Sequence, residues 1–395
     1  MGSDHIRTGR QRWLSVGRSG ETDSRRAGEE AAREAITAAD PGLLIAFCSA
    51  NHDPVAVLAG INSVAAGVPV IGGSTRVVIG PEGPSTTSVV LAALGGPGFS
   101  VATAAADCAG ARAREAGALA AGCLAQVADR PNRVLILLTD GKKVRHEDVL
   151  AGAYRAVGAS APLVGGGTSA DKVTRQSFHL HADQVLTDSV VGAAIGSDGP
   201  LAIGVRHGWR KVGEPMLVTS SRKGDVYSLN DQPAVEAYLR RLGAPEEAYT
   251  DPGAFDLFSK TRPLGVRRRS GEEVRSIHST ALLAEGYLHS AGEIPEGGLV
   301  WVMEGDEDSM LDAAGDACRD AVAGLGGHPP LGLLAFDCES RSGLLGADGM
   351  RAEAERMTAG AAGAPVAGLY TGGEFARVRG FNGYHHQTLV MLAVG

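Results

Sequence analysis

The sequence predicts an α/β fold in which mixed β-sheets are covered by alanine-rich helices. Three observations carry this prediction: short continuously apolar runs, alanine-rich helical stretches between them, and one pattern of both that occurs three times. Apolar runs of about five residues are typical of strands buried on both faces, as in helix-covered sheets. Only 5% of the 395 residues are aromatic, so aliphatic side chains must build most of the core.

The repeated pattern is a helix, an apolar strand with a polar exit, a second helix, a strand preceded by proline, and a final apolar strand ending in glycine. The first helices are predicted at about 24–38, 108–127 and 309–325, and the first strands at 43–47, 134–138 and 331–336. The second helices are predicted at about 54–66, 146–157 and 349–361, the proline-led strands at 68–75, 161–168 and 364–371, and the closing strands at 88–95, 189–196 and 388–395. The unit is roughly α-β-α-β-β, and its length indicates a repeated subdomain, not a solenoid repeat.

The stretch between the second and third copies departs from this pattern. Residues 201–302 carry several short strand signals, and Pro233 opens a predicted helix, because proline is tolerated in a first helical turn. The chain is therefore predicted to hold two domains, over 21–225 and 226–395, with residues 1–20 as a disordered lead-in.

Charge and cysteine content narrow the class of protein. The net charge of −8 disfavours nucleic acid as a partner, and the basic run Arg267-Arg268-Arg269 predicts a solvated turn. No run approaches the roughly 18 apolar residues of a membrane span, and the first 20 residues lack the apolar segment of a signal peptide. The five cysteines are odd in number and have no zinc-site spacing. We therefore expect reduced thiols, a cytoplasmic location, no membrane insertion and no metal.

Polar side chains cluster at the predicted strand exits and loops of the third copy: Cys338, Arg341, Glu374, His385 and His386. Open α/β sheets bind ligands at such strand ends. Arg341 can hold a carboxylate in a bidentate manner, and Glu374 can accept from an ammonium group. Together they predict a site for a zwitterion such as an amino acid. The alternative is that Arg341 and Glu374 pair with each other or with solvent.

Other histidines allow two interpretations each. His207 could contact a ligand with Trp209 as a stacking wall, or it could fix a turn by bonding the backbone. His179 and His181 lie on one face of a predicted strand, where they could bind a metal or haem iron, or simply form a solvated face. No GxxxxGK[ST], GxSxG or HExxH motif occurs, so the common motif-based enzyme classes are not indicated.

Several stretches, taken in order, resemble the FIST family, which has an N-terminal and a C-terminal FIST domain. They are His207-Gly208-Trp209, Leu229-Asn230-Asp231-Gln232-Pro233-Ala234, Phe336-Asp337-Cys338 with Arg341, and Gly383-Tyr384-His385-His386-Gln387-Thr388. The resemblance runs from about residue 27 to the end of the chain. It departs from the family where Cys338-Glu339-Ser340-Arg341 replaces Cys-x-Gly-Arg, and where His385-His386 replaces His-Asn.

The resemblance implies a sensory module for a small ligand such as an amino acid, with a FIST N-type domain over 21–225 and a FIST C-type domain over 226–395. The predicted ligand-binding residues are His207, Trp209, Cys338, Arg341, Glu374, His385, His386 and Thr388. Part of the family senses gases through haem, so haem is one alternative, although no cofactor is predicted. A separate signalling output protein is the expected partner. Two further alternatives are a hydrolase or transferase that uses Cys338, and a partner-binding module without a small ligand.

Overall fold

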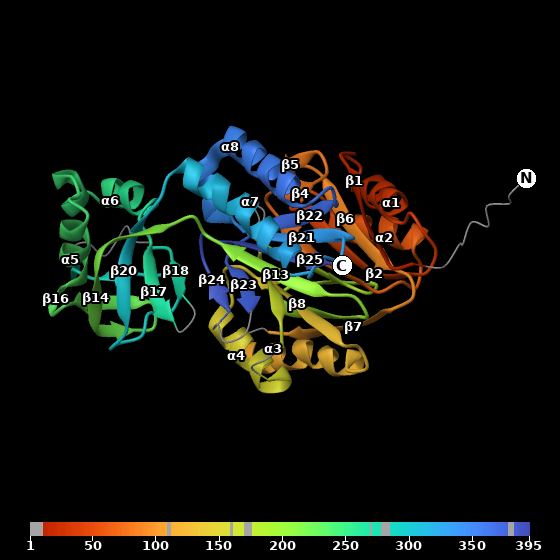
Figure 1. Ribbon diagram of the computed structural model, residues 1–395, viewed down its shortest axis with the longest axis horizontal. Helices are drawn as coiled ribbons and strands as arrows, with labels where there is room; N and C mark the ends of the chain where they lie inside the picture. The colour runs from red at the N-terminus through yellow and green to blue at the C-terminus, as the bar shows by residue number, and fades with distance from the viewer. Residues whose placement is uncertain are drawn as a thin grey trace, which may run out of the picture.

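The computed structural model describes residues 11–108, 112–158, 161–169, 176–268, 271–277, 285–377 and 383–395. These residues form a body of three related units and a further unit inserted into the third (Figure 1). Mixed sheets are covered by helices throughout, which confirms the predicted α/β class. Among the described residues, no helix combines the length and apolarity needed to cross a membrane.

Each unit of the body runs strand, helix, strand, helix, strand, hairpin and closing strand. Unit 1 comprises β1 (Trp13–Ser19), α1 (Ser24–Ala35), β2 (Pro41–Ser49), α2 (Pro54–Val64), β3 (Val70–Thr75), β4 (Val78–Gly80), β5 (Gly83–Ser85) and β6 (Val89–Gly95). Unit 2 comprises β7 (Phe99–Asp107), α3 (Ala113–Ala121), η1 (Gly122–Val127), β8 (Asn132–Asp140), α4 (His146–Val157), β9 (Leu163–Thr168), β10 (His179–His181), β11 (Gln184–Leu186) and β12 (Ser189–Ser197). Unit 3 comprises β13 (Leu201–Arg206), α7 (Glu307–Ala323), β21 (Gly332–Cys338), α8 (Glu339–Gly360), β22 (Val366–Thr371), β23 (Glu374–Arg377), β24 (Tyr384–His385) and β25 (Leu389–Val394).

The opening strand β1 corrects the prediction that residues 1–20 form a disordered lead-in. Residues 1–10 lie outside the described residues, but Trp13–Ser19 pairs with β6 along its whole length. Leu14 is buried, and a Cβ on Gly17 would lie 2.3 Å from the carbonyl oxygen of Ala31 in α1. Polar residues and glycine interrupt the apolar residues of this strand, so it lacks the continuous apolar signal of the central strands.

The three units exchange hairpins. The sheet orders are β1-β6-β2-β3-β10-β11, β7-β12-β8-β9-β23-β24 and β13-β25-β21-β22-β4-β5. Each sheet thus consists of four strands of one unit and an edge hairpin from another. Unit 2 completes the sheet of unit 1, unit 3 completes that of unit 2, and unit 1 completes that of unit 3. The exchange closes a ring, so each unit depends on the other two for its sheet edge.

The inner faces of the three sheets share one hydrophobic core. The rings of Phe47 and Phe336 meet there edge to face, with centroids 6.4 Å apart. The outer faces are covered by the helix pairs α1/α2, α3/α4 and α7/α8, which lie on three sides of the body in Figure 1. Both faces of the central strands are therefore buried, which explains why their sequences are continuously apolar.

Reciprocal glycines bring α3 and α4 into close contact. A Cβ on Gly117 would lie 2.1 Å from the carbonyl oxygen of Val149, and one on Gly152 would lie 1.9 Å from that of Arg114. We expect Gly152→Ala to lower the free energy of unfolding by about 1–3 kcal/mol, because the added methyl group forces the helices apart. Gly122→Ala is the control, since a Cβ there meets nothing within 4 Å. Urea denaturation should show a loss in the first variant only; equal stability would contradict the close contact.

The inserted unit follows β13 and forms the part at the left of Figure 1. It comprises β14 (Arg210–Arg222), β15 (Asp225–Leu229), β16 (Gln232–Pro233), α5 (Ala234–Arg241), η2 (Glu246–Tyr249), α6 (Pro252–Ser259), β17 (Leu264–Arg268), β18 (Gly271–Arg275), β19 (Leu288–His289) and β20 (Leu299–Glu304). Its sheet order is β16-β15-β14-β20-β17-β18, with β19 beside β15. Tyr238 and Phe255 anchor a separate core. The domain boundary proposed from sequence, at 225 and 226, falls at the start of β15, inside this unit.

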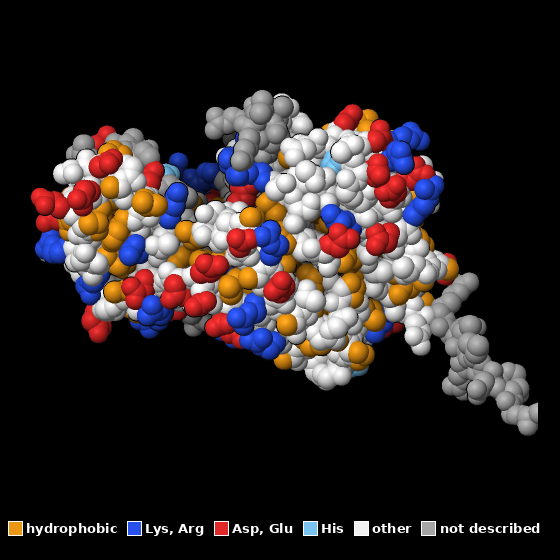
Figure 2. All heavy atoms as spheres, turned by 90° about the horizontal axis from the view of Figure 1, so that it is seen from above, with side chains coloured by type: hydrophobic (Ala, Val, Ile, Leu, Met, Phe, Trp, Pro, Cys, Tyr) orange, Lys and Arg blue, Asp and Glu red, His pale blue; other side chains and the backbone are white. Residues whose placement is uncertain are grey.

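Charged side chains of both signs are interspersed over the body and the inserted unit on the face drawn in Figure 2. Such mixing is typical of a solvated protein surface. Together with the net charge of −8, this mixture of charges does not favour the binding of a polyanion such as nucleic acid.

Candidate functional site

Cys338, Glu374 and Thr388 meet in a buried cluster at the polar ends of the unit 3 strands. The carboxyl group of Glu374 accepts from the hydroxyl of Thr371 at 2.9 Å and from the amide of Thr388 at 3.3 Å. The thiol of Cys338 donates to the same carboxyl group. Burial raises the pKa of Glu374 to about 8 and raises that of the Cys338 thiol as well. The thiol is therefore protonated and hydrogen-bonded, unlike an activated nucleophile.

The protonated Glu374 should make stability depend on pH. Burial lifts its pKa from 4.5 to about 8, so between these values the unfolded chain releases a proton that the folded protein keeps. This stabilisation is complete below about pH 4.5 and is lost as the pH rises toward about 8. The unfolding free energy of the wild type, relative to Glu374→Gln, should fall by about 1.4 kcal/mol per pH unit in this window. Denaturation of both proteins across the window checks this; a pH-independent difference would contradict it.

Arg341 lies in the first turn of α8, not in the predicted loop, and its guanidinium is fully buried. Its Nε lies 2.9 Å from the carboxylate of Asp337, and the group also pairs with Glu353. The remaining N–H groups donate to two backbone carbonyl oxygens, at 3.2 and 3.0 Å. The guanidinium is thus bound within the protein, and the pairing with Glu374 considered from the sequence is not formed.

His207 and Trp209 hold a turn together. The Nδ1 of His207 accepts from the amide of Trp209 at 2.9 Å, and burial lowers the pKa of His207 to about 4. Trp209 is buried and its Nε1 donates to the carbonyl oxygen of Gln387 at 3.2 Å. His385 is also buried, with its Nε2 3.2 Å from the carbonyl oxygen of Ala376. Both imidazoles are neutral and packed.

None of the predicted site residues lines any of four cavities of about 340, 570, 310 and 480 Å³ that described residues border. His386 packs against the ring of Tyr384, with centroids 4.6 Å apart. His179 and His181, the histidines considered as haem ligands, do not line these four cavities either.

His179 corrects a second prediction, that of a solvated strand face. Its ring is fully buried, with Nε2 2.9 Å from the hydroxyl of Thr168 and Nδ1 2.9 Å from that of Ser189. His181 lies 3.2 Å from the hydroxyl of Thr103. In the described part of the chain, no group of three or more His, Cys, Asp or Glu residues is placed to hold a metal ion.

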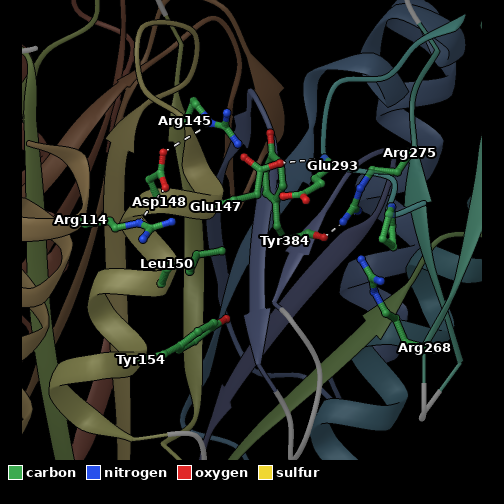
Figure 3. A pocket seen from close by; sticks show the side chains of 12 residues that line it. Arg114, Arg145, Glu147, Asp148, Leu150, Tyr154, Arg268, Arg275, Glu293 and Tyr384 are labelled. Carbon is green, nitrogen blue, oxygen red and sulfur yellow. Dashed lines mark hydrogen bonds and ion pairs between the residues drawn. The ribbon is translucent and has the colours of Figure 1, made fainter. Parts of the chain in front are cut away.

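A cavity of about 340 Å³ lies between α4 and the inserted unit (Figure 3). The α4 wall carries Glu147, Leu150 and Tyr154, and β17 and β18 supply Arg268 and Arg275 opposite. The lining is completed by residues of other segments, namely Arg114, Arg145, Asp148, Ala151, Glu293, Pro295 and Tyr384. The cavity thus draws on segments that are far apart in the sequence.

Both sides of the cavity carry charges of both signs, and on the α4 side Arg114 and Arg145 share the carboxylate of Asp148. Arg268 and Arg275 each lie 2.8 Å from the one carboxylate of Glu273, which leaves a surplus positive charge among these three residues. The Nε of Arg275 is buried and has no hydrogen-bond partner. The carboxylate of Glu147 on α4 accepts from the backbone amide of Glu293 of the inserted unit at 2.9 Å, and neither acid forms an ion pair with a described residue. The cavity therefore offers a ligand both guanidinium groups and carboxylates without an ion-pair partner among the described residues.

Sequence reasoning missed these residues, although two signals point to them. Tyr384 directly precedes the predicted His385, and its hydroxyl lies 2.9 Å from the Nδ1 of His146. Arg268 belongs to the basic run interpreted as a solvated turn: Arg267 is exposed, whereas Arg268 faces the cavity. The third member, Arg269, lies outside the described residues.

Two family models match the chain. The FIST N domain model matches residues 42–232, and the FIST C domain model matches residues 234–377. The chain belongs to the FIST family. FIST domains are sensory modules, and in this FIST protein the cavity lies where the two matched regions meet: α4 belongs to the first, β17 and β18 to the second.

Two solved structures show a weak similarity to the FIST protein. The crystal structure of cyanuric acid hydrolase from A. caulinodans is 12% identical, with a TM-score of 0.28, over 47% of this chain and 71% of that one. A second cyanuric acid hydrolase structure is 13% identical, with a TM-score of 0.25, over 49% of this chain and 71% of that one. Similarity at this level transfers neither activity nor substrate. A search of curated proteins found no match.

Proposed function

We propose that this FIST protein senses a small zwitterion, such as an amino acid, which binds in the cavity between α4 and the inserted unit. The presence of both guanidinium groups and carboxylates in the lining of this cavity supports this proposal most directly. A ligand carboxylate would pair with the guanidinium of Arg268, and an ammonium group would lie beside Glu147 and Glu293. A volume of about 340 Å³ suits a small ligand.

Ligand binding in this cavity would be coupled to the position of the inserted unit relative to α4. Few polar contacts cross the cavity: Glu147 bonds the amide of Glu293, and an Nη of Arg275 donates to the carbonyl oxygen of Tyr384 at 2.9 Å. A ligand that touches both walls would favour the closed arrangement over more open ones. We propose that a separate output protein recognises this change. The five cysteines are free and buried, which fits a reducing compartment such as the cytoplasm.

The predicted site residues would act behind the cavity wall. His386 packs on Tyr384, and the Glu374 cluster lies on the same hairpin. We propose that Cys338, Glu374, His385, His386 and Thr388 hold this hairpin in place. His207, Trp209 and Arg341 would hold the inserted unit to α8.

A thermal-shift screen against the twenty amino acids tests this proposal. Ligand at 100 times its Kd adds about 2.7 kcal/mol of stability, which shifts the midpoint of unfolding visibly. We expect at least one amino acid to do so. Absorbance with added haem is measured in parallel. A haem band without any amino acid response would replace the proposal with the gas-sensor alternative, and no response at all would replace it with the partner-binding alternative.

A further inference from the structure

Arg377, the last residue of β23, is a buried arginine without a carboxylate partner. It is 7% exposed, and its Nε and one Nη have no hydrogen-bond partner. Its guanidinium lies over the ring of Tyr154, 3.8 Å from the centroid, and it forms no ion pair with any described residue. Buried cations are almost always paired. The charge of Arg377 is therefore available to an anion.

Arg377 lines a second cavity of about 570 Å³, where β8, β9 and the start of β13 come together. Arg133 adds a second cation, which is exposed and forms no ion pair with the described part of the chain. The rest of the lining includes the aliphatic side chains of Val157, Leu201 and Ile203 together with the polar side chain of Asn132. Two available cations thus border a space that is partly apolar.

We propose that this cavity binds a carboxylate with an apolar tail, such as a medium-chain fatty acid. The carboxylate would pair with Arg377 and Arg133, and the tail would lie along the apolar lining. An inorganic anion would leave this lining exposed to water, and a neutral lipid would leave the guanidinium of Arg377 unpaired. This cavity shares no lining residue with the zwitterion cavity, and the two approach each other where Arg377 lies over Tyr154.

Calorimetric titration with octanoate, octan-1-ol and inorganic phosphate tests this inference on the full chain. We expect octanoate to bind at least about tenfold more tightly than octan-1-ol or phosphate, since a charge-assisted hydrogen bond contributes about 1.5 kcal/mol or more. Arg377→Gln should weaken octanoate binding by at least about tenfold. Arg133→Gln should weaken it by about threefold, because Arg133 is exposed.

Arg155→Gln is the matched control, since Arg155 is an exposed arginine of α4 that does not line the cavity. It should leave octanoate affinity unchanged. If Arg377→Gln does not fold, the exposed Arg133 still tests the site. No octanoate binding at millimolar concentration, equal binding of octanoate and octan-1-ol, phosphate binding as tight as octanoate, or unchanged affinity in Arg133→Gln would each overturn the inference.

Discussion

Replacing Arg341 with methionine should lower the free energy of unfolding by about 3–5 kcal/mol. The substitution leaves the carboxylates of Asp337 and Glu353 buried together without a cation. Part of this penalty is relieved by proton uptake, because burial already raises the pKa of Asp337. The hydroxyl of Tyr370, which donates to Glu353 at 2.6 Å, cannot replace the lost charge. Urea denaturation at pH 7 measures the loss.

Two exposed arginines of the same helix serve as controls. Arg351 pairs with Asp348, and Arg356 lies 3.3 Å from Asp312, in solvent-exposed pairs. Arg351→Met and Arg356→Met should each cost less than about 1 kcal/mol. A loss in Arg341→Met no greater than these would contradict the buried network. If Arg341 instead contacts the ligand, folded Arg341→Met would lose amino acid affinity at least about tenfold, whereas the network account expects little change.

Arg268→Gln should weaken binding of a responding amino acid by at least about tenfold. The substitution removes the guanidinium group that would pair with the ligand carboxylate, and it leaves Arg275 paired with Glu273. Arg267→Gln is a closely matched control, because Arg267 is the preceding residue on β17 and is exposed. Calorimetric titration of both variants gives the two affinities.

The amide derivative of the same amino acid sharpens this experiment. It lacks the carboxylate charge, so its affinity should differ little between the wild type and Arg268→Gln. An equal loss for the amino acid and its amide would show that Arg268 acts on the fold of the cavity and not on the ligand charge. Unchanged affinity in Arg268→Gln would show that Arg268 does not bind the ligand carboxylate.

Much of the body could be predicted from the sequence, because its signals are local. Strands buried on both faces are continuously apolar, and α4 begins and ends at His146 and Val157 as predicted. The hairpin exchange could not be predicted, since β10 pairs with β3 of another unit and no local pattern specifies that register. β1 was missed because polar residues and glycine interrupt its apolar residues, as in a polar loop.

The candidate site, like the fold, could be predicted from the sequence only in part. Cys338 and Glu374 were grouped from strand exits and loops, Thr388 was added by the resemblance to the FIST family, and the structure brings the three together. The environment of Arg341 could not be predicted, because its guanidinium pairs with Glu353, which lies further along α8. The charged cavity could not be found from sequence, since it forms only where the inserted unit meets α4.

The central claim is that the ligand binds between α4 and the inserted unit, and a cavity-filling variant tests it most directly. Ala151 lines the cavity from the exposed face of α4, so tryptophan can occupy that space without entering the core. Calorimetric titration of Ala151→Trp with the amino acid that gives the largest thermal shift should show no binding, while the midpoint of unfolding without ligand stays close to that of the wild type. Wild-type affinity in this variant would contradict the claim and place the ligand elsewhere in the protein.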